Sequence, residues 1–198
     1  MQQRFAIDAL PVTPWKNGGG STREVACWPP GASLDAFDWR VSIATIAASG
    51  PFSVFPGVDR TIMLLEGDGV RLQSARFDHS LGTPHKPFAF DGEAAVDCSL
   101  RGGASTDFNL MVRRARGAAT LRVLNDAQTL EASSHGLLLS LGGVWHAGDE
   151  TLAPGEGLWW TAQETRWALA PVHADAHLAV VQWQPAHDST PTSAAVST

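Results

Sequence analysis

The chain consists of many short apolar segments separated by Gly, Pro and Asp, and none keeps the apolar spacing of a helix for a dozen residues. Short segments of this kind between turn signals are typical of β-strands in sandwiches and barrels. The sequence therefore predicts an all-β fold. The expected strands are residues 22–28, 37–47, 60–66, 70–74, 94–100, 107–112, 119–125, 136–141, 157–161, 165–169 and 177–183.

Two stretches of the chain resemble one another and indicate an internal duplication. Residues 60–67 and 135–143 are both apolar strands that end in glycines. The duplication predicts two β-barrel halves that meet near residue 115, next to the basic residues 113–116, which are typical of a solvated connection. We expect a first half over 1–115, which would contain the candidate pocket, and a second half over 116–184. Residues 185–198 are rich in Pro, Ser, Thr and Ala and predict a disordered tail.

Composition excludes several classes of function. The formal net charge is -6 and there is no extended basic run, so we expect no nucleic-acid partner. No run of about 18 apolar residues is present, which argues against a membrane span. The first residues lack the apolar core of a signal peptide. Together with only two cysteines among 198 residues, this predicts a cytoplasmic protein with reduced thiols.

The segment 14–20, Pro-Trp-Lys-Asn-Gly-Gly-Gly, is a candidate binding loop. Three consecutive glycines carry a large entropic cost, which is understandable where the backbone turns sharply or approaches another group closely. One interpretation is a tight turn with Trp15 in the core and Lys16 in solvent. The other is a loop that brings Lys16 and Asn17 to a pocket.

Polar residues also alternate with apolar ones inside the expected strands of the first half. Arg40 and Ser42 share one face of their strand, and Asp107 and Asn109 share one face of another. Buried Asp and Asn side chains are costly without partners. They either pair with Arg40 or Arg60 in a structural role or line a polar pocket, and the sequence leaves both open.

The histidines and serines do not match common catalytic motifs. None of the seven histidines forms His-x-His or His-Glu-x-x-His, and no Gly-x-Ser-x-Gly is present. No P-loop and no Gly-x-Gly-x-x-Gly is present either, so nucleotide binding has little support. The pair His173 and His177 could share a strand face, but two surface or hydrogen-bonded histidines are the stronger explanation.

As a set, several motifs resemble the HutD/Ves family. They are Pro-Trp-Lys-Asn-Gly-Gly-Gly at 14–20, Trp39-Arg40-x-Ser42, Gly-Pro-Phe-Ser-x-Phe-Pro-Gly at 50–57 with Phe52, Asp59-Arg60, Leu-Glu-Gly at 65–67, Phe-Asp-Gly at 90–92 and Asp107-Phe-Asn109-Leu-Met111. Their order and spacing extend to about residue 112. Beyond that point the chain resembles the family only in general character.

The resemblance implies a bicupin, two small cupin-like β-barrels packed into one compact unit. With Gly67 at the glycine of the first metal-binding cupin motif, three ligand positions fall on Ser53, Phe55 and Arg60, and with Gly92 in the second motif the fourth falls on Ala95. None of these residues is a usual metal ligand. We therefore expect no metal and no cofactor. An arginine where a cation would normally lie suggests a pocket for a carboxylate, with Lys16 and Arg40 nearby.

The resemblance further implies a regulatory protein of histidine utilisation or of stress responses that binds urocanate or a formyl- or formimino-glutamate-like acid. The expected site residues are Lys16, Asn17, Arg40, Ser42, Phe52, Arg60, Asp107 and Asn109. Pairing of Arg60 with Asp59, Glu66 or Asp107 would contradict this site. Two enzymes are alternatives, a metal-independent isomerase or hydrolase that uses Asp107 or Glu66 as general base, and a dioxygenase with histidine ligands in the second half. Exposed sheet edges could also pair in a homodimer.

Overall fold

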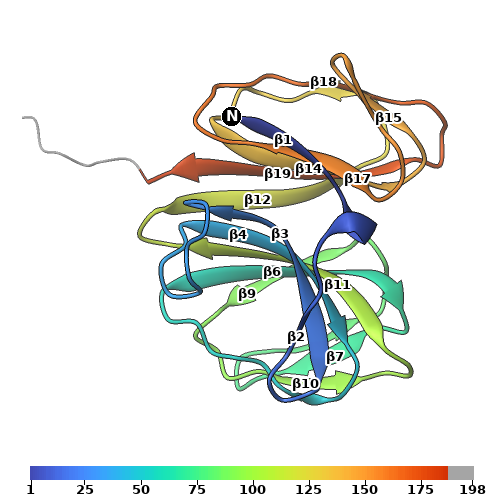
Figure 1. Cartoon of the computed structure of the whole chain (residues 1–198). Coiled ribbons are helices and arrows are strands. Elements are labelled where there is room, and N and C mark those ends of the chain that lie inside the picture. Colours follow the sequence, from blue (N-terminus) through green and yellow to red (C-terminus); the bar gives the residue numbers. More distant parts are fainter. Residues whose placement is uncertain (187–198) are drawn as a thin grey trace, which may run out of the picture.

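The computed structural model describes residues 1–186 and confirms an all-β chain (Figure 1). In this part of the chain the strands form four sheets, and the one helical element is the three-residue 3-10 helix η1 (Ile7–Ala9). No helix among these residues is long and apolar enough to cross a membrane. The predicted tail lies outside the described residues from 187 onward. Pro185, the first residue of the predicted tail, pairs with Gly117 in an antiparallel ladder.

Residues 13–113 form two sheets that face one another. The larger sheet has the order β2-β3-β4-β11-β6-β9 and the smaller has the order β5-β10-β7-β8. The strands are β2 (Thr13–Pro14), β3 (Gly20–Trp28), β4 (Trp39–Ile46), β5 (Gly50–Pro51), β6 (Val58–Gly67), β7 (Val70–Gln73), β8 (Asp78–Leu81), β9 (Pro87–Asp91), β10 (Asp97–Leu100) and β11 (Ser105–Arg113).

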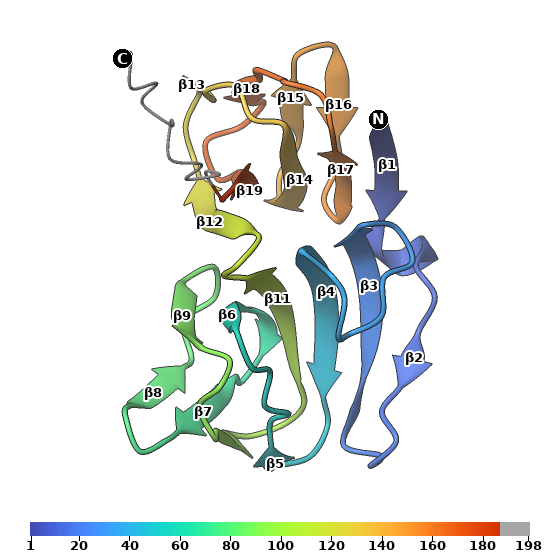
Figure 2. The same ribbon diagram turned by 90° about the vertical axis from the view of Figure 1, so that its left-hand side faces the viewer.

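Residues 2–6 and 117–185 form a second pair of sheets above the first (Figures 1 and 2). We call this second pair the upper sheet pair and the pair formed by residues 13–113 the lower sheet pair. The larger sheet has the order β1-β17-β14-β19-β12 and the smaller has the order β13-β18-β15-β16. The strands are β1 (Gln2–Ala6), β12 (Gly117–Leu124), β13 (Gln128–Thr129), β14 (His135–Gly142), β15 (Trp145–Ala147), β16 (Glu150–Leu152), β17 (Glu156–Trp160), β18 (Ala168–Pro171) and β19 (His177–Pro185).

Alternation along the central strands divides the apolar side chains among three large buried clusters and a smaller fourth one around Phe37 and Met111. On β11, Phe108 and Leu110 point toward the upper sheet pair, where they meet Leu137 and Leu139 of β14 in one buried cluster. The intervening residues of β11 point into the lower pair of sheets. That interior and the interior of the upper pair have apolar clusters of their own. The two sheet pairs are therefore joined by a continuous hydrophobic layer.

The N-terminal segment connects the two sheet pairs. β1 pairs with β17 of the upper pair, whereas β2 pairs with β3 of the lower pair (Figure 2). The guanidinium of Arg23 donates hydrogen bonds to the carbonyls of Ile7 and Leu10 and holds the connection in place. Residues 2–6, which the predicted boundary at 115 assigns to the first half, thus complete a sheet of the second.

Barrel closure is not confirmed, because none of the four sheets in residues 1–186 closes on itself. Each of the eleven predicted segments overlaps a strand of the structure, with bounds that differ by a few residues. The strands missed by the sequence analysis are mainly edge strands of two to five residues, such as β2, β5, β8 and β16. Strands this short have too few residues to display the alternation by which a strand is recognised.

Candidate functional site

The glycine-rich loop is a tight turn that requires glycine at two positions for two different reasons. Gly18 has a φ of 70°, which favours glycine. A side chain on Gly20 would collide with the backbone oxygen of Thr45 and contact the ring of Trp15. The indole of Trp15 donates a 2.8 Å hydrogen bond to the Thr22 hydroxyl, which fixes the ring against β3.

The two predicted binding residues of this loop have different positions. Lys16 is exposed, as the tight-turn interpretation expected, and forms no ion pair within residues 1–186. The Asn17 side chain accepts a 3.0 Å hydrogen bond from the Gly19 N–H, so it stabilises the turn. Asn17 also lines a small hollow together with Phe52 and Cys98. The structure therefore brings Asn17, but not Lys16, next to another predicted site residue.

Five predicted residues line the interior of the lower sheet pair, on three adjacent strands. In the registers of β11 with β4 and β6, Asn109 lies opposite Ser42, and Met111 lies between Arg40 and Arg60. Asp107 lies two residues before Asn109, so the pleat directs both side chains to the same face. Arg60, Ser42, Asp107 and Asn109 are all buried. The alternation in the sequence thus correctly predicted which polar residues share a face.

Arg40 is neutralised within the protein. Its Nε donates a 2.7 Å hydrogen bond to the Glu24 carboxylate on β3, and its Nη1 donates to the Ser42 hydroxyl at 3.2 Å. The Glu24 side chain is half exposed, so this ion pair lies at the margin of the interior. Arg40 and Ser42 are therefore structural partners, and their charge and hydroxyl are already engaged.

Arg60, in contrast, is a buried cation without an acidic partner in the described part of the chain. It is 9% exposed, and no ion pair within residues 1–186 includes it. Asp59, one of its expected partners, pairs with Arg114 at 2.7 Å instead. The Arg60 Nη1 donates one long hydrogen bond of 3.4 Å to the Ser53 carbonyl, and its Nε has no partner.

Three phenylalanine rings surround the Arg60 guanidinium. Its central carbon lies 5.0 Å from the ring centroids of Phe52 and Phe90 and 5.6 Å from that of Phe55. Each such contact contributes roughly 0.5–2 kcal/mol to holding a cation. Burial nevertheless lowers the pKa of Arg60 to about 10. The rings partly replace water, but they offer no hydrogen-bond acceptor.

Asp107 is the second unpaired group of this interior. Its side chain is fully buried and neither carboxyl oxygen has a hydrogen-bond partner within the described chain. Burial raises the pKa of Asp107 to about 6. The nearby Ser105 hydroxyl opposes this rise by a smaller amount without forming a hydrogen bond to the carboxyl. Asn109 donates to the backbone carbonyl of Asp107 at 3.2 Å rather than to its carboxyl group.

Cys98, Phe55 and Phe90 belong to this site although the sequence analysis did not select them. Burial raises the pKa of Cys98 to about 12, the neighbouring Asp107 adds to this effect, and Arg60 opposes it. Cys98 is thus an inert thiol near both unpaired groups. Phe55 and Phe90 both lie in motifs of the family resemblance, but no pattern in the sequence indicated that their rings would meet one arginine.

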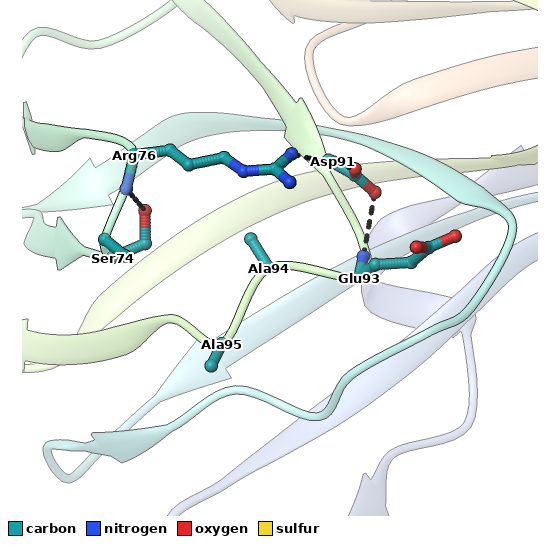
Figure 3. A pocket seen from close by; sticks show the side chains of 7 residues that line it. Ser74, Arg76, Asp91, Glu93, Ala94 and Ala95 are labelled. Atoms are coloured by element: carbon teal, nitrogen blue, oxygen red, sulfur yellow. Dashed lines mark hydrogen bonds and ion pairs between the residues drawn. The ribbon is translucent and has the colours of Figure 1, made fainter.

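The hollows of the lower sheet pair differ in size and in the groups that line them. The hollow beside Asn17, Phe52 and Cys98 has a volume of about 30 Å³, enough for one water molecule. A larger surface pocket of about 320 Å³ is lined by residues 74–76, 91 and 93–95 (Figure 3). None of the predicted site residues lines it.

The charged groups of the larger pocket bind one another. Arg76 reaches Asp91 at 3.5 Å, and the other oxygen of Asp91 accepts a 2.9 Å hydrogen bond from the Glu93 N–H (Figure 3). Arg114 also pairs with Asp91 and Glu93. The pocket therefore offers no buried, unpaired group to a ligand. Within residues 1–186 no three His, Cys, Asp or Glu side chains lie close enough together to hold a metal ion.

Solved structures place this architecture among cupin-like all-β proteins. A cupin 2 conserved barrel domain protein from Leptotrichia buccalis has the same fold, with a TM-score of 0.59 and 7% identity over 92% of this chain and 96% of its own. HutD from Pseudomonas fluorescens SBW25, in a formate condition, is far more similar, with a TM-score of 0.84 and 28% identity. That match covers 94% of this chain and all of the other.

The chain belongs to the HutD family, whose model matches residues 8–180. Protein Ves from Citrobacter koseri is 44% identical over 158 residues, which are 79% of this chain and 81% of that protein. A conserved protein of unknown function from Pseudomonas aeruginosa PAO1 is 32% identical, with a TM-score of 0.82 over 93% of this chain and 99% of its own. The HutD/Ves resemblance found in the sequence is confirmed.

Proposed function

We propose that this protein binds a small carboxylate in the interior of its lower sheet pair, with Arg60 as the group that recognises the negative charge. The supporting observation is that Arg60 is buried, charged and without an acidic partner among residues 1–186. Burial of an unpaired charge is expensive, and an anionic ligand would supply the missing acceptor. The planar guanidinium suits a carboxylate because it can donate two parallel hydrogen bonds.

Asp107 would assist binding in its protonated form. An ionised Asp107 would repel an incoming carboxylate, whereas a protonated carboxyl can donate a hydrogen bond to it. Burial already raises the pKa of this group to about 6, and a bound anion would raise it further. Binding should therefore take up a proton near neutral pH.

A ligand larger than a water molecule requires movement of the segment around Phe52 and Phe55. The small hollow lined by Phe52 and Cys98 has a volume of only about 30 Å³, and neither Arg60 nor Asp107 lines it. The segment is held by hydrogen bonds from the Phe52 N–H to Val96 and from the Phe55 N–H to Gly92, and Val54 within it is 49% exposed. It is thus the part of the site that can open at the smallest cost in contacts.

We assign the ligand to urocanate or to a formyl- or formimino-glutamate-like acid, and the role to regulation of histidine utilisation or of a stress response in the cytoplasm. Membership of the HutD family and the formate condition of one related structure are consistent with this assignment. We also propose that the two sheet pairs are two cupin units, 1–115 and 116–184, and that β1 of the first segment completes a sheet of the second unit.

Thermal unfolding of the full chain with urocanate, formimino-glutamate, formyl-glutamate, glutamate and formate tests the proposal. A ligand at 100 times its dissociation constant stabilises the folded state by about 2.7 kcal/mol, which raises Tm by roughly 5–10 °C for a chain of this length. Arg60→Met keeps an apolar stem among the phenylalanines and should abolish the shift. Arg71→Met, which removes an exposed arginine of the same sheet pair, is the control. No shift with any acid, or an unchanged shift in Arg60→Met, would refute the site.

A metal-independent isomerase or hydrolase is the second candidate, because Asp107 has the raised pKa that a general base needs. Glu66, the other predicted base, is exposed at the end of β6 and does not line the interior. If the protein is an enzyme, Asp107→Asn should abolish turnover of the acid and retain its binding. An NMR assay that detects product formed from the bound acid distinguishes the enzyme from the binding protein.

The predicted homodimer would use the outer edge of β12, which pairs with no strand of residues 1–186. Ala186 donates its N–H to the Arg116 carbonyl. Because hydrogen-bonded pairs alternate along an antiparallel ladder, residues 118, 120 and 122 of β12 are the ones that form hydrogen bonds with β19. The N–H and C=O groups of Ala119, Leu121 and Val123 then point away from β19. This edge has no proline and one charge, and it therefore lacks the usual protection against pairing with a second copy.

A further inference from the structure

Two histidines from different sheet pairs meet at the boundary between the pairs. His85 lies in the loop between β8 and β9, and His177 is the first residue of β19. Their ring centroids are 5.1 Å apart with planes inclined by 49°. Neither residue belongs to the interior that contains Arg60.

We propose that His85 and His177 together bind a divalent transition metal ion such as Zn²⁺ or Ni²⁺. An imidazole nitrogen binds zinc at about 2.0–2.1 Å, which places the ring centroid about 3.2 Å from the metal. Two such rings at the tetrahedral angle have centroids about 5.2 Å apart. The observed 5.1 Å is close to this value, so the separation of the rings permits both imidazoles to reach one ion.

The hydrogen bond of His177 orients it as a ligand. Its Nδ1 lies 3.0 Å from the backbone carbonyl oxygen of Asp175. Since a carbonyl can only accept, Nδ1 is the donor, and in the neutral ring the lone pair is on Nε2. Histidines that bind metals commonly donate their other N–H to a carbonyl or carboxylate in this way.

The backbone of His85 provides an independent indication. Its φ is 63°, a left-handed conformation that residues other than glycine rarely adopt and that often marks a functional position. The His85 N–H donates a 3.0 Å hydrogen bond to the Leu64 carbonyl, which holds the loop against β6. Within residues 1–186 no hydrogen bond occupies the His85 ring.

Water would complete the coordination, because no third His, Cys, Asp or Glu of residues 1–186 lies at this place. The expected affinity is therefore that of a two-histidine site, well below that of a structural zinc centre. The ion would link the lower sheet pair to β19 of the upper pair. A bound ion should consequently stabilise the association of the two sheet pairs.

Calorimetric titration of the untagged full chain with ZnCl₂ and with NiCl₂, followed by thermal unfolding, tests the proposal. We expect one ion per chain and a higher Tm in the presence of excess metal. His85→Asn, which tolerates the left-handed backbone, and His177→Gln should each reduce affinity at least tenfold and remove the Tm rise. His79→Ala is the control, because His79 stacks on Phe88 elsewhere in the lower pair.

Two results would overturn the proposal. One is the absence of both heat and a Tm rise up to millimolar metal. The other is wild-type metal affinity in His85→Asn and His177→Gln, which would locate binding at other histidines. Circular dichroism of both variants without metal verifies that they fold.

Discussion

The buried carboxyl of Asp107 should make the stability of this protein fall as pH rises from about 4 to 6. In the unfolded chain this carboxyl loses its proton near pH 3.8, whereas burial raises its pKa in the folded state to about 6. Between these values the folded state binds more protons than the unfolded state. The contribution of Asp107 to the free energy of unfolding therefore decreases with rising pH and is constant above about pH 6.

The size of this effect follows from the pKa. A rise from 3.8 to about 6 corresponds to about 3 kcal/mol, at 1.36 kcal/mol per unit. Asp107→Asn keeps the shape of the side chain and removes the ionisation. Relative to wild type, the variant should gain up to about 3 kcal/mol between pH 4 and pH 7. The neutral amide has its own cost of burial, but this cost does not vary with pH.

Urea unfolding of wild type and Asp107→Asn at pH 4, 5, 6, 7 and 8 measures the difference directly. Asp97→Asn is the control, because Asp97 is exposed on the neighbouring β10. We expect a difference between Asp107→Asn and wild type that rises through pH 4–6 and then levels off. A difference that is flat with pH would show that Asp107 does not titrate in this range and would refute the argument from burial.

Three further predictions concern the fold and its assembly. Gly20→Ala should destabilise the protein by about 2 kcal/mol or more in urea unfolding, because the added carbon meets the backbone of Thr45, whereas Gly50→Ala, where nothing lies within 4 Å, should change little. Leu139→Ala empties a fully buried position between the sheet pairs and should cost about 2–5 kcal/mol, with a single unfolding transition if the pairs unfold together. If the chain dimerises through β12, light scattering should find a dimer for wild type and a monomer for Ala119→Pro, and a wild-type monomer would contradict that interface.

Much of the candidate site could be predicted because its residues follow simple alternation. Arg40 and Ser42, like Asp107 and Asn109, occur at every second position between apolar residues, and such a pattern assigns each pair to one face of its strand. Arg60 was selected from the family resemblance instead. The position of Lys16 could not be predicted in this way. It follows a tryptophan in a turn whose geometry depends on contacts between Gly20 and β4, which are distant in the sequence.

The partners of the charged residues were also beyond local patterns. Asp59 immediately precedes Arg60 but pairs with Arg114, since neighbouring residues of a strand point to opposite faces. The meeting of three phenylalanines on Arg60 joins a loop and two strands. The pairing of β1 with β17 likewise joins segments that are far apart in the sequence, and no signal near residues 2–6 indicates it.

The sequence by itself determined the all-β class, the family, most strands and the polar face of the lower sheets, because alternation and turn residues act over a few positions. Only the tertiary structure decided that no acid of residues 1–186 pairs with Arg60, that Arg40 is neutralised by Glu24, and that His85 lies beside His177. These facts depend on which side chains converge in space. Convergence is set by strand order and sheet packing over the whole chain, which no short stretch of sequence specifies.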